Sequence, residues 1–217
     1  MSEEKFMDNK TLDNVSINDL LVAMLNNTTE LKNIEDVSAT KDVLDRIMIL
    51  NDVDDISSES VTHLIRFWNN VDKDIPVEER KPIKLLIDSY GGSLVGGLMI
   101  ADAISMSKTP VHTINIGSAY SAGLLVFITG HRRFCYPSAS FLFHEGSTAT
   151  AGLVDAGKFR NYADFYEQLI LRMKNYFLKC TDMTEELYKE KYKDDWWFFA
   201  DEALELGFCD EILEELI

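Results

Sequence analysis

Short apolar runs alternate with amphipathic stretches through most of the chain. The runs have the character of buried strands and fall at 46–50, 83–88, 111–116, 134–135 and 141–143. Between them, apolar positions recur every three or four residues, which predicts helices over about 57–69 and from the end of the second run to Ile104. Strands that alternate with helices predict βαβ units and a mostly parallel sheet.

The last third of the sequence predicts helices of very different lengths. One helix is expected over about 154–178; because it is long, amphipathic and flanked by polar segments, we expect an arm that packs on another subunit. Thr184 is placed to cap a short helix that begins at Glu185. A last small helix from Ala200 is expected to end at Gly207.

The beginning of the chain differs from the rest. It is polar and acidic, with a single predicted helix near Ile17 to Asn26. We therefore interpret residues 1–40 as an acidic N-terminal extension and residues 41–217 as one domain.

Net charge excludes several classes of partner. Asp and Glu number 37 against 21 Lys and Arg, so the chain carries −16 at neutral pH. We expect no binding to nucleic acid or to anionic membrane surfaces. No apolar stretch approaches the roughly 20 residues that cross a bilayer, and the N-terminus lacks the apolar region of a signal peptide, so the expected location is the cytoplasm.

The cysteines predict neither a disulfide framework nor a zinc site. There are three, Cys135, Cys180 and Cys209, and they are widely spaced. We interpret them as small apolar residues, and we expect no metal and no other cofactor.

Two glycine-containing turns, each between a strand and a helix, are the candidate positions for chemistry. The first contains Gly91 and Gly92, and the second spans 117–123. Ligands of parallel α/β sheets bind at the carboxyl ends of strands, and the unpaired N–H groups at a helix start attract anions, including the oxyanion of acyl transfer. The first turn fits a tight structural connection as well as it fits a substrate site.

Ser121 lies in the second turn among small residues. Taken alone, it fits a helix N-cap better than a nucleophile. A nucleophilic serine needs a base, usually histidine, and a carboxylate that fixes the imidazole tautomer. The turn is not the G-x-S-x-G elbow, because Gly123 lies two residues after the serine.

A base and an acid are available later in the sequence. His144 directly follows the run 141–143, whereas His63, His112 and His131 fall in a predicted helix, a strand and a polar turn. A histidine at a strand end facing a loop is the best placed of the four. Asp194 and Asp195 precede the aromatic block 196–199, and we expect such rings to shield an aspartate from water and strengthen its interaction with a histidine.

Five segments between about residue 42 and residue 213 form a recognisable series. They are Arg46-Ile47-Met48-Ile49-Leu50, Ile87-Asp88-Ser89-Tyr90-Gly91-Gly92-Ser93, Gly117-Ser118-Ala119-Tyr120-Ser121-Ala122-Gly123, Phe143-His144, and Asp195 with the helix Ala200-Asp201-Glu202-Ala203-Leu204-Glu205-Leu206-Gly207. In these segments and in their order the sequence resembles ClpP, the peptidase component of the Clp protease. Tyr90 stands where the family usually has proline, and Glu145-Gly146 stands where it has Gln-Pro.

The resemblance implies a fold and an activity. The fold would be a ClpP/crotonase-like spiral of βαβ units with a protruding handle over about 149–179. Ser121 would be the nucleophile, His144 the base and Asp195 the residue that orients it, with the backbone N–H groups of Gly92 and Ala122 as the oxyanion hole.

The resemblance also implies partners. The chain would be a serine endopeptidase that cleaves peptides or unfolded proteins inside two stacked heptameric rings, supplied by a Clp-type ATPase unfoldase. Two alternatives stay open: a non-catalytic subunit that co-assembles with or modulates another peptidase, and a crotonase-type enzyme that binds a thioester enolate. Both are disfavoured by the retention of all three members of the Ser, His, Asp set.

Overall fold

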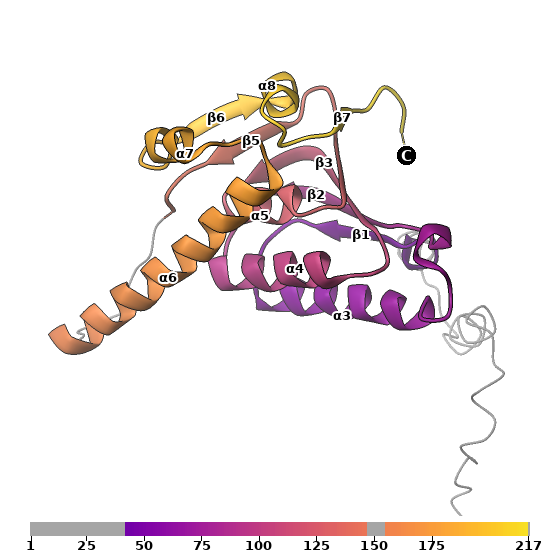
Figure 1. The fold of residues 1–217 in the computed structure, drawn as a ribbon, viewed down its shortest axis with the longest axis horizontal. Helices are drawn as coiled ribbons and strands as arrows, with labels where there is room; N and C mark the ends of the chain where they lie inside the picture. Colours follow the sequence, from indigo (N-terminus) through magenta and orange to yellow (C-terminus); the bar gives the residue numbers. More distant parts are fainter. Residues whose placement is uncertain (1–41, 147–154, 217) are drawn as a thin grey trace, which may run out of the picture. The chain divides into compact units, whose positions relative to one another are not determined.

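The computed structural model describes residues 42–146 and 155–216 of the chain. Seven strands form one sheet in the order β1-β2-β3-β4-β7, with β5 against β3 and β6 against β5 (Figure 1). The strands are β1 Ile47–Leu50, β2 Ile83–Ser89, β3 Val111–Tyr120, β4 Arg132–Cys135, β5 Ser140–Phe143, β6 Trp196–Phe199 and β7 Glu211–Ile212. Every pairing is parallel except that of β5 with β6. The predicted α/β class with a mostly parallel sheet is confirmed.

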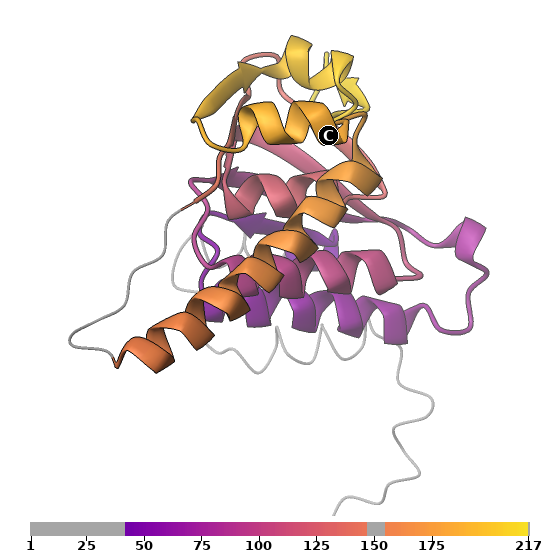
Figure 2. The same cartoon turned by 60° about the vertical axis from the view of Figure 1, so that its left-hand side comes forward.

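The helices fall between the strands. They are α3 Asp55–Val71, the 3₁₀ turn η1 Val77–Glu79, α4 Leu94–Met106, α5 Ala122–Ile128, α6 Ala156–Cys180, α7 Glu185–Lys191 and α8 Ala200–Glu205. Figures 1 and 2 show α3 and α4 side by side on one side of the sheet, with α5 between α4 and the central strands. The helix predicted near residues 17–26, the extension 1–40 and the first residues of the expected handle lie outside the described residues.

Helix starts follow side-chain caps in the sequence. Asp54 Oδ1 accepts a hydrogen bond from the Ser57 N–H at 2.7 Å, so α3 begins two residues before the periodicity predicted. Thr184 caps α7 through the Leu187 N–H at 3.1 Å, as predicted. Gly207, predicted to end the last helix, has φ 66°, the left-handed conformation that glycine adopts at helix ends.

Strand β3 is longer than the sequence pattern predicted. The expectation that Gly117 ends it is wrong, because the strand continues to Tyr120. Its first half pairs with β4 and its second half with β5, so it passes from one neighbour to the next. A larger residue would not fit at position 117, because a Cβ on Gly117 would lie 2.7 Å from Oδ1 of Asp88. This oxygen accepts hydrogen bonds from the Ser118 N–H and hydroxyl. The extra residues carry the second turn to the sheet's carboxyl edge.

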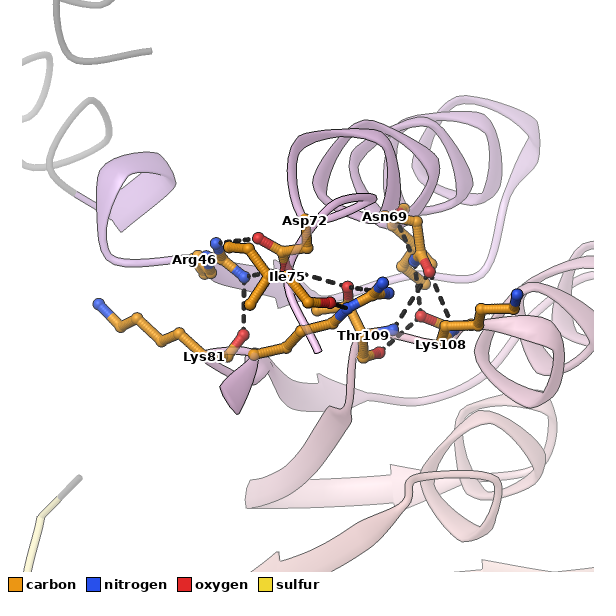
Figure 3. A network of polar contacts seen from close by, with 10 residues as sticks. Arg46, Asn69, Asp72, Ile75, Lys81, Lys108 and Thr109 are labelled. Carbon is orange, nitrogen blue, oxygen red and sulfur yellow. Dashed lines mark hydrogen bonds and ion pairs between the residues drawn. The ribbon is translucent and has the colours of Figure 1, made fainter. Parts of the chain in front are cut away.

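A buried polar network fixes the start of β1 (Figure 3). Arg46, with φ 62°, donates two hydrogen bonds to the carboxylate of Asp72 at 2.6 and 2.7 Å, and a third to the carbonyl of Lys81 at 2.7 Å. The Thr109 hydroxyl also donates to Asp72, at 2.9 Å. The Asp72 side chain is fully buried, so its charge depends on these donors for compensation. The network joins the end of α3 to the start of β1 and, through Thr109, to the segment just before β3.

The three cysteines are free thiols. Cys135 and Cys209 are buried and Cys180 is half-buried.

Among residues 42–146 and 155–216, no helix has both the length and the apolar character needed to cross a bilayer.

Candidate active site

The two glycine-containing turns pack directly against each other. A Cβ on Gly91 would lie 2.7 Å from the carbonyl oxygen of Tyr120 and 2.8 Å from Cβ of Ser121. Gly91 has φ 98° and Gly92 has φ 140°, conformations that other residues rarely adopt. A bridge between Gly92 and Val53 holds the first turn from its other side, where a Cβ on Gly92 would lie 2.3 Å from the Val53 carbonyl oxygen. The glycines therefore allow the backbone of the first turn to reach the backbone of Ser121.

Ser121 has a strained backbone and does not cap the helix that follows it. Its φ of 54° and ψ of −122° lie outside the regions that serine usually occupies. It occupies the N-cap position of α5, yet its side chain makes no capping hydrogen bond, so the interpretation as a helix cap is wrong. Its N–H donates instead to the Leu142 carbonyl at 2.9 Å, which fixes the serine against β5. Strain of this kind is concentrated at functional sites.

A groove of about 520 Å³ opens over these turns. Four of the five predicted site residues line it: Gly92, Ser121, Ala122 and His144. The remainder of its wall comes from the start of α4, the end of β5 and one face of α6, through Tyr90, Ser93, Leu94, Val95, Leu142, Phe143, Glu145, Gly146, Tyr162, Phe165, Tyr166, Leu169, Ile170, Met173 and Phe177. The groove wall is therefore mostly apolar, with the serine and the histidine among its few polar residues.

Asp195 does not line the groove but contacts the histidine from behind. Its Oδ1 lies 3.3 Å from Nδ1 of His144. The Nε2 of His144 is buried, and within the described ranges it has no hydrogen-bond partner, just as the Ser121 hydroxyl has none. A carboxylate on Nδ1 favours the tautomer in which Nε2 accepts a proton, the arrangement that a general base requires.

One expectation about Asp195 is wrong. The aromatic block does not shield it, since 63% of its side chain is exposed. The block forms the edge strand β6, antiparallel to β5, and its side chains alternate between the core and the solvent: Phe198 is buried whereas Trp197 and Phe199 are exposed. Asp195 comes just before that strand, where the chain still faces water. Its attraction to His144 is correspondingly screened by solvent.

An aromatic cluster that the sequence patterns did not reveal holds His144 in place. Phe143, one residue earlier, is buried at 2% exposure and packs edge-on against Phe177, Tyr188 and Trp196 at centroid distances of 4.9, 5.2 and 6.3 Å. These partners come from α6, α7 and β6. Three separate segments thus fix the end of β5 and the histidine that follows it.

A second aromatic chain joins the two turns to β6. Tyr120 packs edge-on against Tyr90 at 5.4 Å and against Trp197 at 5.0 Å, and its hydroxyl is hydrogen-bonded to that of Ser140 at 2.7 Å. The only signal in the sequence was a tyrosine in or next to each turn, Tyr90 before Gly91 and Tyr120 within 117–123. The contact gives Tyr90, the residue at the family's usual proline position, a structural role.

The other histidines lie away from the groove. His63 is exposed on α3, His112 packs on Phe134, and His131 accepts a hydrogen bond from the Val111 N–H at 3.0 Å. Burial and nearby cations lower the pKa of His112, which keeps it neutral at physiological pH. Across the described segments, no group of three or more His, Cys, Asp or Glu side chains could hold a metal ion.

Comparison with known proteins matches the chain to one family and to several of its members. The model of a family described as Clp protease matches residues 32–216. An ATP-dependent Clp protease proteolytic subunit of Streptococcus mutans is 32% identical over 173 residues, which cover 77% of this chain and 84% of that protein. Proteins with the same name from Lactococcus lactis and Paracoccus denitrificans are 31% and 28% identical, covering 77% and 75% of this chain and 82% and 78% of their own lengths.

Proposed function

The chain belongs to the Clp protease family, and on this basis we propose that it is a serine endopeptidase that hydrolyses peptide bonds of peptides and unfolded proteins. The observation that carries the proposal is the convergence on one groove of a strained serine, a histidine paired with a carboxylate, and the start of a helix. No cofactor is needed for this chemistry, because the nucleophile, the base and the oxyanion donors all belong to the chain.

In the proposed reaction, the Ser121 hydroxyl attacks the scissile carbonyl while Nε2 of His144 takes its proton. The N–H groups of Gly92 and Ala122 stabilise the oxyanion that forms. Ala122 is the first residue of α5, so its N–H is among those without an intrahelical partner, and the adjacent turn brings Gly92 to the same groove. His144 then gives the proton to the leaving amine, and water hydrolyses the acyl-enzyme by the same steps in reverse order.

Asp195 is proposed to orient His144 and to stabilise its protonated form. We expect Asp195→Asn to lower kcat by about a hundredfold. This loss is smaller than that for a buried triad aspartate, because solvent already weakens the interaction of the exposed carboxylate with His144. Steady-state cleavage of a fluorogenic peptide measures this. The matched control is Asp194→Asn, which changes the exposed neighbouring aspartate and should leave kcat as it is. Equal effects of the two substitutions would rule out the role of Asp195.

We further propose that the chain assembles as two stacked heptameric rings through α6, the described part of the expected handle. The helix runs outward from the rest of the domain in both views (Figures 1 and 2), and only Met173 and Phe177 on it are buried. Phe159, Phe165 and Leu171 are 53%, 55% and 48% exposed. Large apolar side chains that are exposed on a projecting helix are typical of an interface with another copy. The same assembly would accept substrates from a Clp-type ATPase.

Assembly can be tested at a residue outside the groove. We expect Phe159→Glu to shift the sedimentation profile toward smaller species, because it places a charge on the proposed interface. A control with the same charge change is Met106→Glu, at a residue of α4 that is 76% exposed. A particle that remains intact in Phe159→Glu would count against α6 as the contact between rings.

A further inference from the structure

One carboxylate, that of Glu145, stands in the groove without a role in the reaction proposed above. It directly follows His144, is exposed, and lines the same groove as Ser121. Among the described residues that line the groove, Glu145 is the only acidic residue, and none of them is Lys or Arg. Glu145 is therefore the one carboxylate of the groove wall, while the second carboxylate near His144, that of Asp195, lies outside the groove and contacts the ring at Nδ1.

No cation of the described chain neutralises Glu145. It takes part in none of the ion pairs or side-chain hydrogen bonds found in residues 42–146 and 155–216. Residues 147–154, Ser-Thr-Ala-Thr-Ala-Gly-Leu-Val, contain no ionisable side chain, so the adjoining segment brings no counter-charge of its own. The charge of Glu145 is available to a ligand.

Tyrosines of α6 and of the segment after α7 surround this carboxylate. Tyr162 and Tyr166 stack with centroids 6.4 Å apart and an angle of 25° between their planes, and both line the groove. Burial and then the negative charge of Glu145 raise the pKa of Tyr192 to about 12, and burial, Tyr162 and Glu145 together raise that of Tyr166. The faces of the Tyr162 and Tyr166 rings attract cations.

We propose that Glu145 and the rings of Tyr162 and Tyr166 form a subsite for a cationic side chain, so that the enzyme prefers peptides with Lys or Arg close to the scissile bond. This inference rests on the proposed peptidase function. A cation in the subsite would pair with the Glu145 carboxylate while its aliphatic stem packs on the tyrosine rings. The net charge of −16 adds a long-range attraction for the same substrates.

The expected preference is moderate. A part-exposed ion pair together with a cation–π contact favours the cationic substrate by about three- to tenfold. Because the charges are accessible to solvent, the preference should shrink as salt is added. A glutamate in place of the lysine should be disfavoured, since two carboxylates would then face each other.

The test uses the full-length assembled protein and quenched fluorescent peptides of one neutral sequence. Each peptide carries lysine, norleucine or glutamate at a single position, from three residues before the scissile bond to three after it. Norleucine matches the length of the lysine stem without its charge. We expect one position at which kcat/KM for lysine exceeds that for norleucine by about three- to tenfold, and a ratio close to one in Glu145→Gln. The control Glu79→Gln, on η1 and outside the groove, should keep the wild-type ratio.

A second measurement separates this proposal from the peptidase function. The same peptides are bound to Ser121→Ala, and to Ser121→Ala combined with Glu145→Gln, with fluorescence anisotropy as the readout. If no peptide is cleaved by the wild-type protein, the proposed function is wrong, but a binding preference for lysine that disappears with Glu145→Gln still supports the subsite. A lysine-to-norleucine ratio near one at every position, or one that survives Glu145→Gln, overturns the subsite.

Discussion

Replacing Ser121 with alanine is expected to lower the rate of peptide hydrolysis by at least about a thousandfold. The proposed reaction has no other nucleophile: Ser121 lines the groove together with His144 and directly precedes the first residue of α5. The residual rate would come from the oxyanion donors and from binding alone. Steady-state cleavage of a fluorogenic peptide by purified protein, corrected for contaminating proteases, measures the effect.

The structure predicts that this loss is chemical rather than conformational. The Ser121 side chain makes no hydrogen bond within the described residues, so its removal breaks none of those bonds. Alanine at φ 54° carries strain similar to that of serine. Circular dichroism and sedimentation of Ser121→Ala should match the wild type. The control Ser138→Ala, at an exposed position between β4 and β5, should keep full activity. Hydrolysis by Ser121→Ala at more than a tenth of the wild-type rate would contradict the assignment.

The largest loss of stability is expected from Asp72→Ala. The substitution leaves the Arg46 guanidinium, whose side chain is 10% exposed, without its carboxylate. Breaking a buried ion pair in this way costs about 3–5 kcal/mol of unfolding free energy. The loss would also free the Thr109 hydroxyl and loosen the connection between α3 and β1 (Figure 3). Urea or thermal denaturation measures it.

Two variants isolate the pair. Asp74→Ala removes an exposed aspartate two residues later and should leave stability nearly unchanged. Arg46→Met combined with Asp72→Leu removes both charges together and should recover most of the loss, since a buried ion pair is often replaceable by apolar side chains of similar volume. If Asp72→Ala and Asp74→Ala unfold alike, the network does not stabilise the fold as described.

The same carboxylate makes stability depend on pH. Burial raises the pKa of Asp72, but hydrogen bonds from Arg46 and Thr109 together with the charges of Arg46 and Arg80 outweigh it, so the folded-state pKa lies below the ordinary value of 3.8. A group whose pKa is lowered by folding stabilises the protein above its unfolded pKa. This contribution should therefore be fully present above about pH 5 and be lost as the pH falls through the folded-state value. Asp72→Ala should flatten this part of the stability profile.

Local patterns in the sequence predicted most of the fold. Apolar runs located the strands, and caps such as Thr184 and the stop at Gly207 located helix ends, because these signals act within a few residues. The length of β3 was not predictable in this way. Glycine is common at strand ends, whereas β3 continues through Gly117 because its second half pairs with β5 and Ser118 is hydrogen-bonded to Asp88 of the neighbouring strand.

The sequence predicted which residues would lie together in the candidate site but not their surroundings. The order of Ser121, His144 and Asp195 followed from strand ends, glycine turns and a family resemblance. The exposure of Asp195 depends on the pairing of β6 with β5, which is a long-range contact without a local signal. The aromatic contacts of Phe143 and Tyr120 likewise join segments far apart in the chain. The strained backbone of Ser121 and the absence of a capping hydrogen bond from its side chain are properties that the residue types do not reveal.

Ser121 is proposed to be an activated nucleophile in an oxyanion-binding groove. Treatment of the native protein with a peptidyl diphenyl phosphonate, read by intact mass, tests it most directly, because such reagents phosphonylate an activated serine and release phenol. We expect one added phosphonyl group per chain in the wild-type protein, none in Ser121→Ala, and slow labelling in His144→Ala. Equal labelling of wild-type protein and Ser121→Ala, or an assembled wild-type particle that remains unlabelled, would contradict it.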